Sequence, residues 1–238
     1  VPYEGIKSLP YYEALVKRLD SGNGDDVFMI DHDTALSFEK KGYLSDLADL
    51  PTISTFSRLA LDQMEADGAI CYVPTSISAF GLYCNLGLLE ARGIAAPRTV
   101  AEFEHACEAF LAEGMTPLVA NNDISFKTLA LARGMAEVYA AEDARARIAA
   151  LSNDPDALAA QLRSGLDLVE RFVAAGYVDA ALALETKKTA DDLDQFATGQ
   201  YPFMLTGAWA SVRVHDMAPD LAYEVHPLPV LDEGPVLV

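Results

Sequence analysis

The segment from Phe196 to Ala210 constrains the fold more than any other part of this 238-residue sequence. Gly199 stands where a helix would stop, because glycine takes left-handed backbone dihedrals at little cost. Tyr201–Leu205 is an apolar run of strand length, and Thr206-Gly207 breaks it before a new helix. A strand end that leads into a helix is where open α/β folds bind their ligands.

Strand-length apolar runs alternate with helical patterns along the rest of the chain. Helices are expected over Tyr11–Leu19, Thr34–Lys41, Asn85–Ala91, Val100–Glu113, in three stretches between Lys127 and Ala175, and over Ala190–Ala197. Strands are expected at Val27–Ile30, Ile70–Val73, Ala79–Cys84, Pro117–Ala120, Tyr201–Leu205 and Tyr223–Leu228, the first of them as a buried parallel strand. This order predicts an α/β fold with a second lobe.

Composition excludes several classes of partner. The formal net charge is −19, and such a surface repels phosphate backbones, so nucleic acid is not an expected partner. The sequence has no apolar run long enough to span a membrane. Cys71, Cys84 and Cys107 have no metal-ligand spacing and do not identify a redox compartment; Cys71 and Cys84 could pair.

Four groups of segments resemble a known family. They are Asp20–Phe28 with Phe38–Leu47; Tyr72–Asn85 with Leu88–Ile94 and Pro97–Phe103; Gly176–Val178; and Phe196–Ala210 with Tyr223–Pro229. Their order and spacing resemble the extracellular solute-binding proteins of carbohydrate ABC importers, the maltose-binding-protein-like family 1.

The resemblance implies a two-lobe periplasmic-binding-protein type II fold, with mixed sheets flanked by helices. Residues 1–77 would form part of the first, N-terminal lobe, and residues 78–238 most of the second. Pro74–Gly81 would be the first crossing between lobes, and Pro229–Val238 would lie near the second. Family members are longer, and the chain starts at Val1 without an initiator methionine, so we expect an incomplete fold, truncated at both ends.

The resemblance also implies what such a chain does. A sugar or oligosaccharide would be captured between the lobes by a hinge motion and delivered to an ABC transporter permease in the membrane. The family performs no chemistry, so no catalytic residue, cofactor or metal is expected, and the protein would be a monomer. Its place would be extracytoplasmic, either periplasmic or lipid-anchored at the outer face of the cell membrane, with a signal segment that is not in this chain.

Trp209 and Gly207 are the main candidates for ligand contact. Trp209 is the only tryptophan, and an indole offers a flat apolar face with a polar edge, which suits a sugar ring. Gly207 would let the backbone approach the ligand. The structural alternatives are a core tryptophan and an ordinary turn glycine.

The polar candidates could bind hydroxyl groups. Asp31 could accept strong charge-assisted hydrogen bonds, or it could cap the helix that follows, with His32 beside it. A metal role for His32 is disfavoured because no second ligand cluster exists. The other candidates for ligand contact are Ser76, Ser78, Tyr83, Asn85, Asn122, Phe126, Tyr3 and Glu4. For the two serines a plain hinge role is as favourable, and for Asn85 helix capping is the stronger interpretation.

Three other functions stay open at this point. A binding protein for a polyamine, a peptide or a glycerol phosphate is the main alternative, because an acidic protein attracts cations, whereas a phosphate ester would need basic residues near the candidates. A carbohydrate-active enzyme could use paired carboxylates, but the sequence has no nucleophile elbow, His-Glu-x-x-His or P-loop motif. An interaction domain without a ligand is the third.

Overall fold

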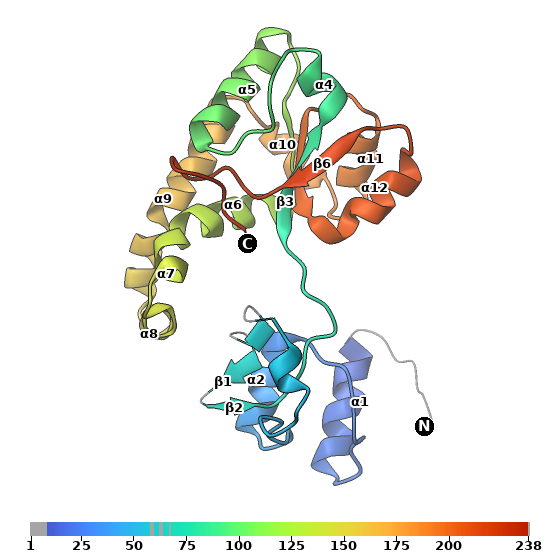
Figure 1. Cartoon of the computed structure of the whole chain (residues 1–238), viewed down its shortest axis with the longest axis vertical. Helices are drawn as coiled ribbons and strands as arrows, with labels where there is room; N and C mark the ends of the chain where they lie inside the picture. Colours follow the sequence, from blue (N-terminus) through green and yellow to red (C-terminus); the bar gives the residue numbers. More distant parts are fainter. Residues whose placement is uncertain (1–8, 58–59, 62–63, 67, 238) are drawn as a thin grey trace. The chain divides into compact units, whose positions relative to one another are not determined.

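The computed structural model describes residues 9–57, 60–61, 64–66 and 68–237. The chain divides into two units, Val1–Ile77 and Ser78–Val238 (Figure 1). That these units correspond to parts of two lobes stays a prediction, and each unit is therefore described by itself.

The first unit is small and its core is modest. Its elements are α1 (Leu9–Asp20), α2 (His32–Lys40), the 3-10 turn η1 (Ile53–Thr55) and an antiparallel pair, β1 (Glu65–Ala66) and β2 (Ala69–Ile70). One core cluster consists of Ile53, Ala60 and Met64, with partly buried side chains such as Phe56 and Tyr72 packed on it, and Leu15, Ala35 and Phe38 are buried as well. The strand expected at Ile70–Val73 is shorter in the structure and lies earlier in the chain, because β2 covers only Ala69–Ile70.

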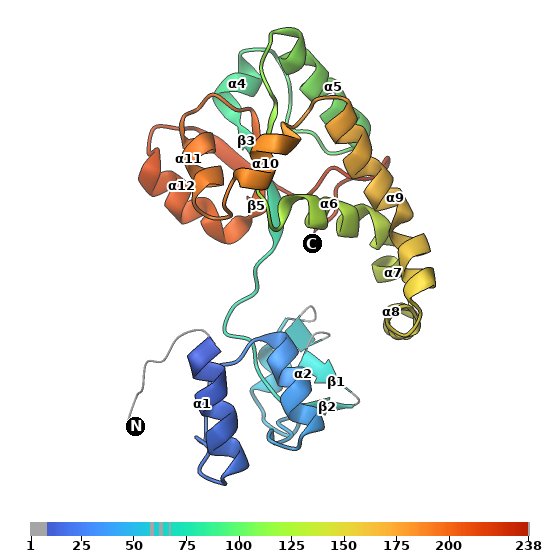
Figure 2. The same cartoon turned by 180° about the vertical axis from the view of Figure 1, so that it is seen from behind.

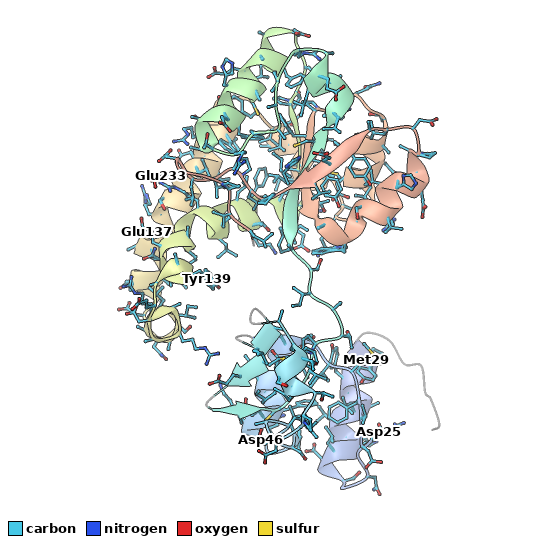
Figure 3. All side chains as sticks on the ribbon, in the orientation of Figure 1. Asp25, Met29, Asp46, Glu137, Tyr139 and Glu233 are labelled. Carbon is cyan, nitrogen blue, oxygen red and sulfur yellow. The ribbon has the colours of Figure 1, made fainter. Side chains whose placement is uncertain are left out.

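The prediction of a buried strand at Val27–Ile30 is wrong. The segment forms no strand, and 89% of Val27 and 70% of Met29 is exposed. Met29 is labelled in Figure 3. A buried strand needs a neighbour for its N–H and C=O groups. Instead, the ring of Phe28 packs on Phe38, and the Tyr11 hydroxyl donates to the Met29 carbonyl. The apolar run is present in the sequence, but no strand of the described residues lies beside it.

The second unit is built on a four-stranded mixed sheet in the order β4-β5-β3-β6 (Figures 1 and 2). The strands are β3 (Phe80–Asn85), β4 (Leu118–Val119), β5 (Phe203–Gly207) and β6 (Tyr223–His226). The pair β4 and β5 is parallel, whereas β3 is antiparallel to both β5 and β6. The surrounding helices are α4 (Leu86–Glu90), α5 (Val100–Ala112), α6 (Ser125–Gly134), α7 (Ala136–Ala140), α8 (Ala144–Ser152), α9 (Pro155–Ala174), α10 (Ala180–Glu185), α11 (Asp191–Ala197), η2 (Ala208–Ala210) and α12 (Ser211–Met217).

Alternating side chains bury both faces of this sheet. On β3, Leu82 and Cys84 belong to one core cluster, which includes Phe103 of α5 and Phe172 of α9. Tyr83 belongs to the other cluster, together with residues of α11 and α12. Side chains of a strand point alternately to its two faces, so the sheet lies between two helical layers. The predicted mixed α/β architecture is confirmed for this unit.

Local capping explains where the helices begin and end. The predicted capping box of Thr99 and Glu102 is present at α5, and Asp154 caps α9 ahead of Pro155. Gly199 has φ 71° after α11, as a helix-stopping glycine should. Helix α10 was not predicted, although Asp179 caps it through the Leu182 N–H.

All three cysteines are free thiols, and burial separates them by reactivity. Burial raises the pKa of Cys84 to about 12 and raises that of Cys107 further, whereas Cys71 is only partly buried. The thiolate is the reactive form, so both buried thiols should be inert at pH 8. We expect a thiol reagent to titrate Cys71 alone in the native protein and all three cysteines in denaturant. Two fast native thiols would contradict this.

None of the described helices is long and apolar enough to cross a membrane.

Candidate functional site

The strongest candidate site lies where β4 and β5 end. Parallel strands have their carboxyl ends at the same edge of a sheet, and here β4 leads into Asn121 and Asn122 while β5 ends at Gly207. Phe80 pairs in register with Gly207, so the first residue of β3 lies at this edge too. Trp209 follows in η2. We call Phe80, Asn122, Gly207 and Trp209 the sheet edge.

Trp209 is half exposed and is held in place by two neighbours. Its exposed fraction is 46%, and its ring packs edge-on against Phe80 with ring centroids 5.2 Å apart. A Cβ atom on Gly207 would lie 2.2 Å from two atoms of the indole, so the indole occupies the space that a side chain would need. From the sequence, the missing side chain of Gly207 was expected to leave room for a ligand. In the structure the indole of Trp209 fills that room. Gly207 therefore acts by seating Trp209.

Gly207→Ala should displace the indole. A contact of 2.2 Å cannot persist, so the ring or the backbone has to move, and overpacking of this kind costs about 1–3 kcal/mol. Because Trp209 is the only tryptophan, its fluorescence emission reports the change directly. Gly87→Ala in α4 is the control, since a Cβ there meets only the Asn85 Oδ1 at 3.6 Å. Wild-type emission and melting temperature in Gly207→Ala would contradict the assignment.

Asn122 is presented by a tight turn at the start of α6. The buried Asn121 accepts hydrogen bonds at Oδ1 from the N–H groups of Asp123 and Ile124, which fixes this turn. The Asn122 backbone N–H donates to the Thr186 carbonyl, and its side chain is exposed. Phe126, the second residue of α6, packs against the first core cluster. Of the two predicted loop residues, Asn122 thus offers a free polar group and Phe126 mainly packs.

The charged groups beside Asn122 form one cluster in which two lysines share one carboxylate. The Asp123 carboxylate accepts a hydrogen bond from Lys127 at 2.5 Å and another from Lys188. These two hydrogen bonds lower the pKa of Asp123 to about 2. Few basic residues lie near the candidates in the sequence. In the folded chain Lys127 and Lys188 lie beside Asn122, and both bind the Asp123 carboxylate.

Tyr83 and Asn85 serve the fold of the second unit. Tyr83 is fully buried; its hydroxyl donates to the Gly207 carbonyl at 2.9 Å, and burial raises its pKa far above the ordinary value. Asn85 caps α4 by accepting from the Leu88 N–H, and its amide donates to the Gly199 carbonyl. The expectation that either side chain contacts a ligand therefore has no support in the structure. Tyr83 supports the sheet edge through its hydrogen bond to the Gly207 carbonyl.

In the first unit, Asp31 and His32 are tied to tyrosines. Asp31 caps α2: it accepts from the Thr34 N–H at 2.8 Å and from the Tyr12 hydroxyl at 2.8 Å, and these hydrogen bonds, Thr34 first, lower its pKa. His32 Nδ1 lies 2.7 Å from the Tyr72 hydroxyl. The sequence predicted that these two residues follow a strand. That expectation is wrong, because Val27–Ile30 forms no strand.

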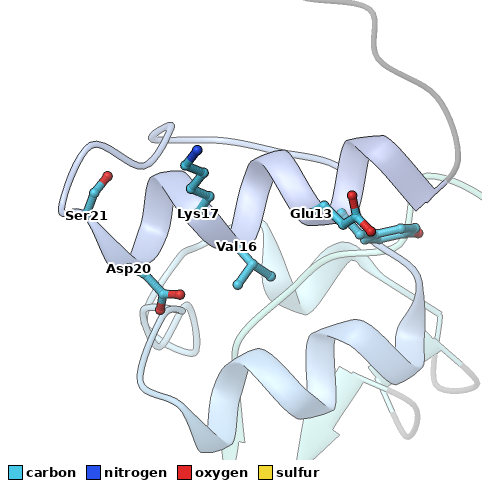
Figure 4. Close-up of a pocket in the computed structure, with 6 residues that line it drawn as sticks. Glu13, Val16, Lys17, Asp20 and Ser21 are labelled. Atoms are coloured by element: carbon cyan, nitrogen blue, oxygen red, sulfur yellow. The ribbon is translucent and has the colours of Figure 1, made fainter.

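The remaining candidates are not assembled into a site. Ser76 and Ser78 are exposed in irregular chain, one in each unit, and Tyr3 and Glu4 lie outside the described residues. A shallow hollow of about 630 Å³ runs along α1 (Figure 4), but none of the predicted site residues lines it. In the part of the chain that the structure describes, no three His, Cys, Asp or Glu side chains gather as a metal site would require.

Sequence reasoning missed two residues that matter here. Phe80 supports the Trp209 ring, and its signal was its place at the start of a predicted strand. Asp192 is a fully buried carboxylate behind the sheet edge, and nothing in its local sequence distinguishes it from the acids around it.

Comparison with known proteins places the chain in a family. Residues 6–237 match the model of the bacterial extracellular solute-binding proteins, and the chain belongs to that family. No curated protein matches the sequence.

Solved structures with the same fold share little sequence with the chain. The apo form of RafE from Streptococcus pneumoniae is 19% identical, with a TM-score of 0.74 over 98% of this chain and 60% of its own. A family 1 extracellular solute-binding protein from Bifidobacterium longum subsp. infantis is 20% identical, with a TM-score of 0.75 over 95% and 60%. A sugar transporter from Bacillus licheniformis, in complex with stachyose, is 18% identical, with a TM-score of 0.67 over 95% and 60%.

These matches confirm the expected family and its fold in incomplete form. The chain spans about 60% of the length of the solved structures that it resembles.

Proposed function

We propose that this chain is part of a carbohydrate-binding subunit of an ABC importer. Such a subunit captures a sugar or oligosaccharide and delivers it to a membrane permease. The observation that carries the proposal is the half-exposed Trp209, seated on Gly207 and supported by Phe80 where β5 ends. The sugar ring would lie on the free part of the indole.

The chemistry of the sheet edge suits a neutral polyol. A sugar has apolar C–H faces that stack on an aromatic ring and hydroxyl groups that need hydrogen-bond partners. The exposed amide of Asn122 can donate and accept at once. The stachyose bound to the Bacillus licheniformis protein supports the same class of ligand. Asp123 pairs with Lys127 and Lys188, so these three side chains together carry one net positive charge, and glycerol phosphate is therefore a necessary control for the sugar assignment.

The wider assignment follows from membership in the family. Residues 1–77 would be part of the first lobe and residues 78–238 most of the second, with Ser76 and Ser78 near the crossing. The protein would act outside the cytoplasm, periplasmic or lipid-anchored, as a monomer that binds no nucleic acid and performs no chemistry. Asp31 and His32 would contribute from the first lobe.

A thermal-shift screen tests the proposal directly. The intact protein is heated with mono- and oligosaccharides, and with spermidine and glycerol phosphates as controls. A ligand at 100 times its dissociation constant stabilises by about 2.7 kcal/mol, which is a shift of several degrees. A shift with sugars alone supports the proposal. A shift only with spermidine or glycerol phosphate replaces it with the non-sugar alternative, and no shift with any compound contradicts it.

A further inference from the structure

Asp192 is a carboxylate without exposed surface that lies behind the sheet edge. Its Oδ2 accepts hydrogen bonds from the Asn121 side-chain amide at 2.9 Å and from the Thr206 hydroxyl at 3.1 Å. Its Oδ1 accepts from the backbone N–H groups of Ala190 at 3.1 Å and Leu193 at 2.9 Å. Four neutral donors therefore converge on one buried carboxyl group.

These four donors come from three separate segments. Asn121 belongs to the loop between β4 and α6 and directly precedes Asn122. Thr206 is the residue before Gly207 in β5, and Ala190 and Leu193 lie at the start of α11. One carboxylate thus links the β4–α6 loop, the end of β5 and the start of α11.

The segment before α11 is held in an unusual backbone conformation. Thr189 has φ 58°, in the left-handed region that residues other than glycine rarely adopt. The Arg213 guanidinium of α12 donates to the Thr189 carbonyl, and the Asp192 carboxylate accepts from the next residue, Ala190. Such strain persists only where the surroundings fix it, and here Asp192 is one of the fixing contacts.

A side chain with two acceptor oxygens fits this arrangement best. Each of its oxygens faces donors, and an asparagine amide would turn an NH₂ group toward one of the two pairs. The Asn121 side chain cannot flip to compensate, because its Oδ1 already accepts from Asp123 and Ile124. A leucine or alanine would leave buried donors without partners.

We propose that Asp192 is the positioning residue of the sheet edge: its carboxylate fixes the β4–α6 loop and the end of β5 relative to each other. Asn122 and Trp209 are thereby presented together before a ligand arrives. The role in binding rests on the proposed function, whereas the positioning of Trp209 does not. Supporting contacts of this kind set how well a binding site is preorganised.

The test follows the single indole N–H of Trp209 by NMR in the ligand-free 238-residue chain. Asp192→Asn should shift or split this resonance. Thr206→Val removes one of the two donors to Asp192 Oδ2 and should shift the resonance less. Asp194→Asn is the matched control, because Asp194 is exposed on the same helix and the charge change is the same. Phe172→Leu is a core control on the opposite face of the sheet, which lowers stability without touching the edge.

The proposal holds if the resonance moves in Asp192→Asn and Thr206→Val but not in the two controls. It is overturned if both edge variants fold and keep the wild-type resonance, or if Phe172→Leu moves it equally. Should Asp192→Asn not fold, Thr206→Val decides alone.

Binding in the intact protein gives an independent readout, because sugar affinity should fall on the order of tenfold in Asp192→Asn and stay unchanged in Asp194→Asn. A wild-type protein that binds no sugar refutes the proposed function and leaves the resonance test valid.

Discussion

Gly165→Ala should lower the free energy of unfolding of the second unit by about 3 kcal/mol. Gly165 lies where α9 crosses α6, and a Cβ atom there would be 1.9 Å from the Ala130 carbonyl oxygen and 2.7 Å from its carbonyl carbon. Backbone atoms cannot rotate away as a side chain can, so the two helices would have to separate. Thermal unfolding measures the loss, and the melting temperature should fall by roughly 6–12 °C.

A second helical glycine provides the comparison for Gly165. Gly87→Ala in α4 adds a methyl group that makes only an ordinary contact, so the usual helix preference for alanine should stabilise the protein by up to about 1 kcal/mol. Equal melting temperatures for the two variants would contradict a close crossing of α6 and α9. Because α6 begins directly after the Asn122 turn, a shifted crossing should also disturb the sheet edge.

Much of the second unit could be predicted because its signals are local. Thr99 with Glu102 starts a helix, Asp154 with Pro155 starts another, and Gly199 stops one, whatever the rest of the chain does. The strand at Val27–Ile30 failed because a buried strand depends on a partner distant in sequence, and apolar spacing does not report whether that partner is there. Strand ends shifted for the same reason: β5 continues through Gly207, because β3 pairs with it up to Phe80.

The candidate site divides along the same line. Trp209 and Gly207 became candidates because the single tryptophan, two residues after a turn glycine, is visible in the sequence, and their contact with a ligand stays a prediction; only the structure shows that the indole packs over the glycine. Tyr83 looked like a contact residue, but strand alternation turns it into the second core cluster. Asp192 could not be found, since its partners Asn121 and Thr206 lie 71 and 14 residues away.

Trp209→Ala should weaken sugar binding by about 1–3 kcal/mol, the range that aromatic stacking contributes at other ring-binding surfaces. The truncation removes the exposed part of the indole, which is the stacking surface, and leaves Phe80 without its edge-on neighbour. At 25 °C this corresponds to a dissociation constant raised roughly 5- to 150-fold. Isothermal titration calorimetry on the intact protein, with the sugar that gives the largest thermal shift, measures it.

Tyr139→Ala is the matched control for this change. Tyr139 is an exposed aromatic of α7 with 68% of its surface free, and it lies outside the sheet edge (Figure 3). Its removal should leave the affinity unchanged, whereas Trp209→Phe should retain part of it, because a smaller ring still stacks. An unchanged affinity in a folded Trp209→Ala variant would remove Trp209 as the stacking surface. An equal loss in Tyr139→Ala would show that the effect is not specific to the sheet edge, because the two aromatics share exposure and differ in place.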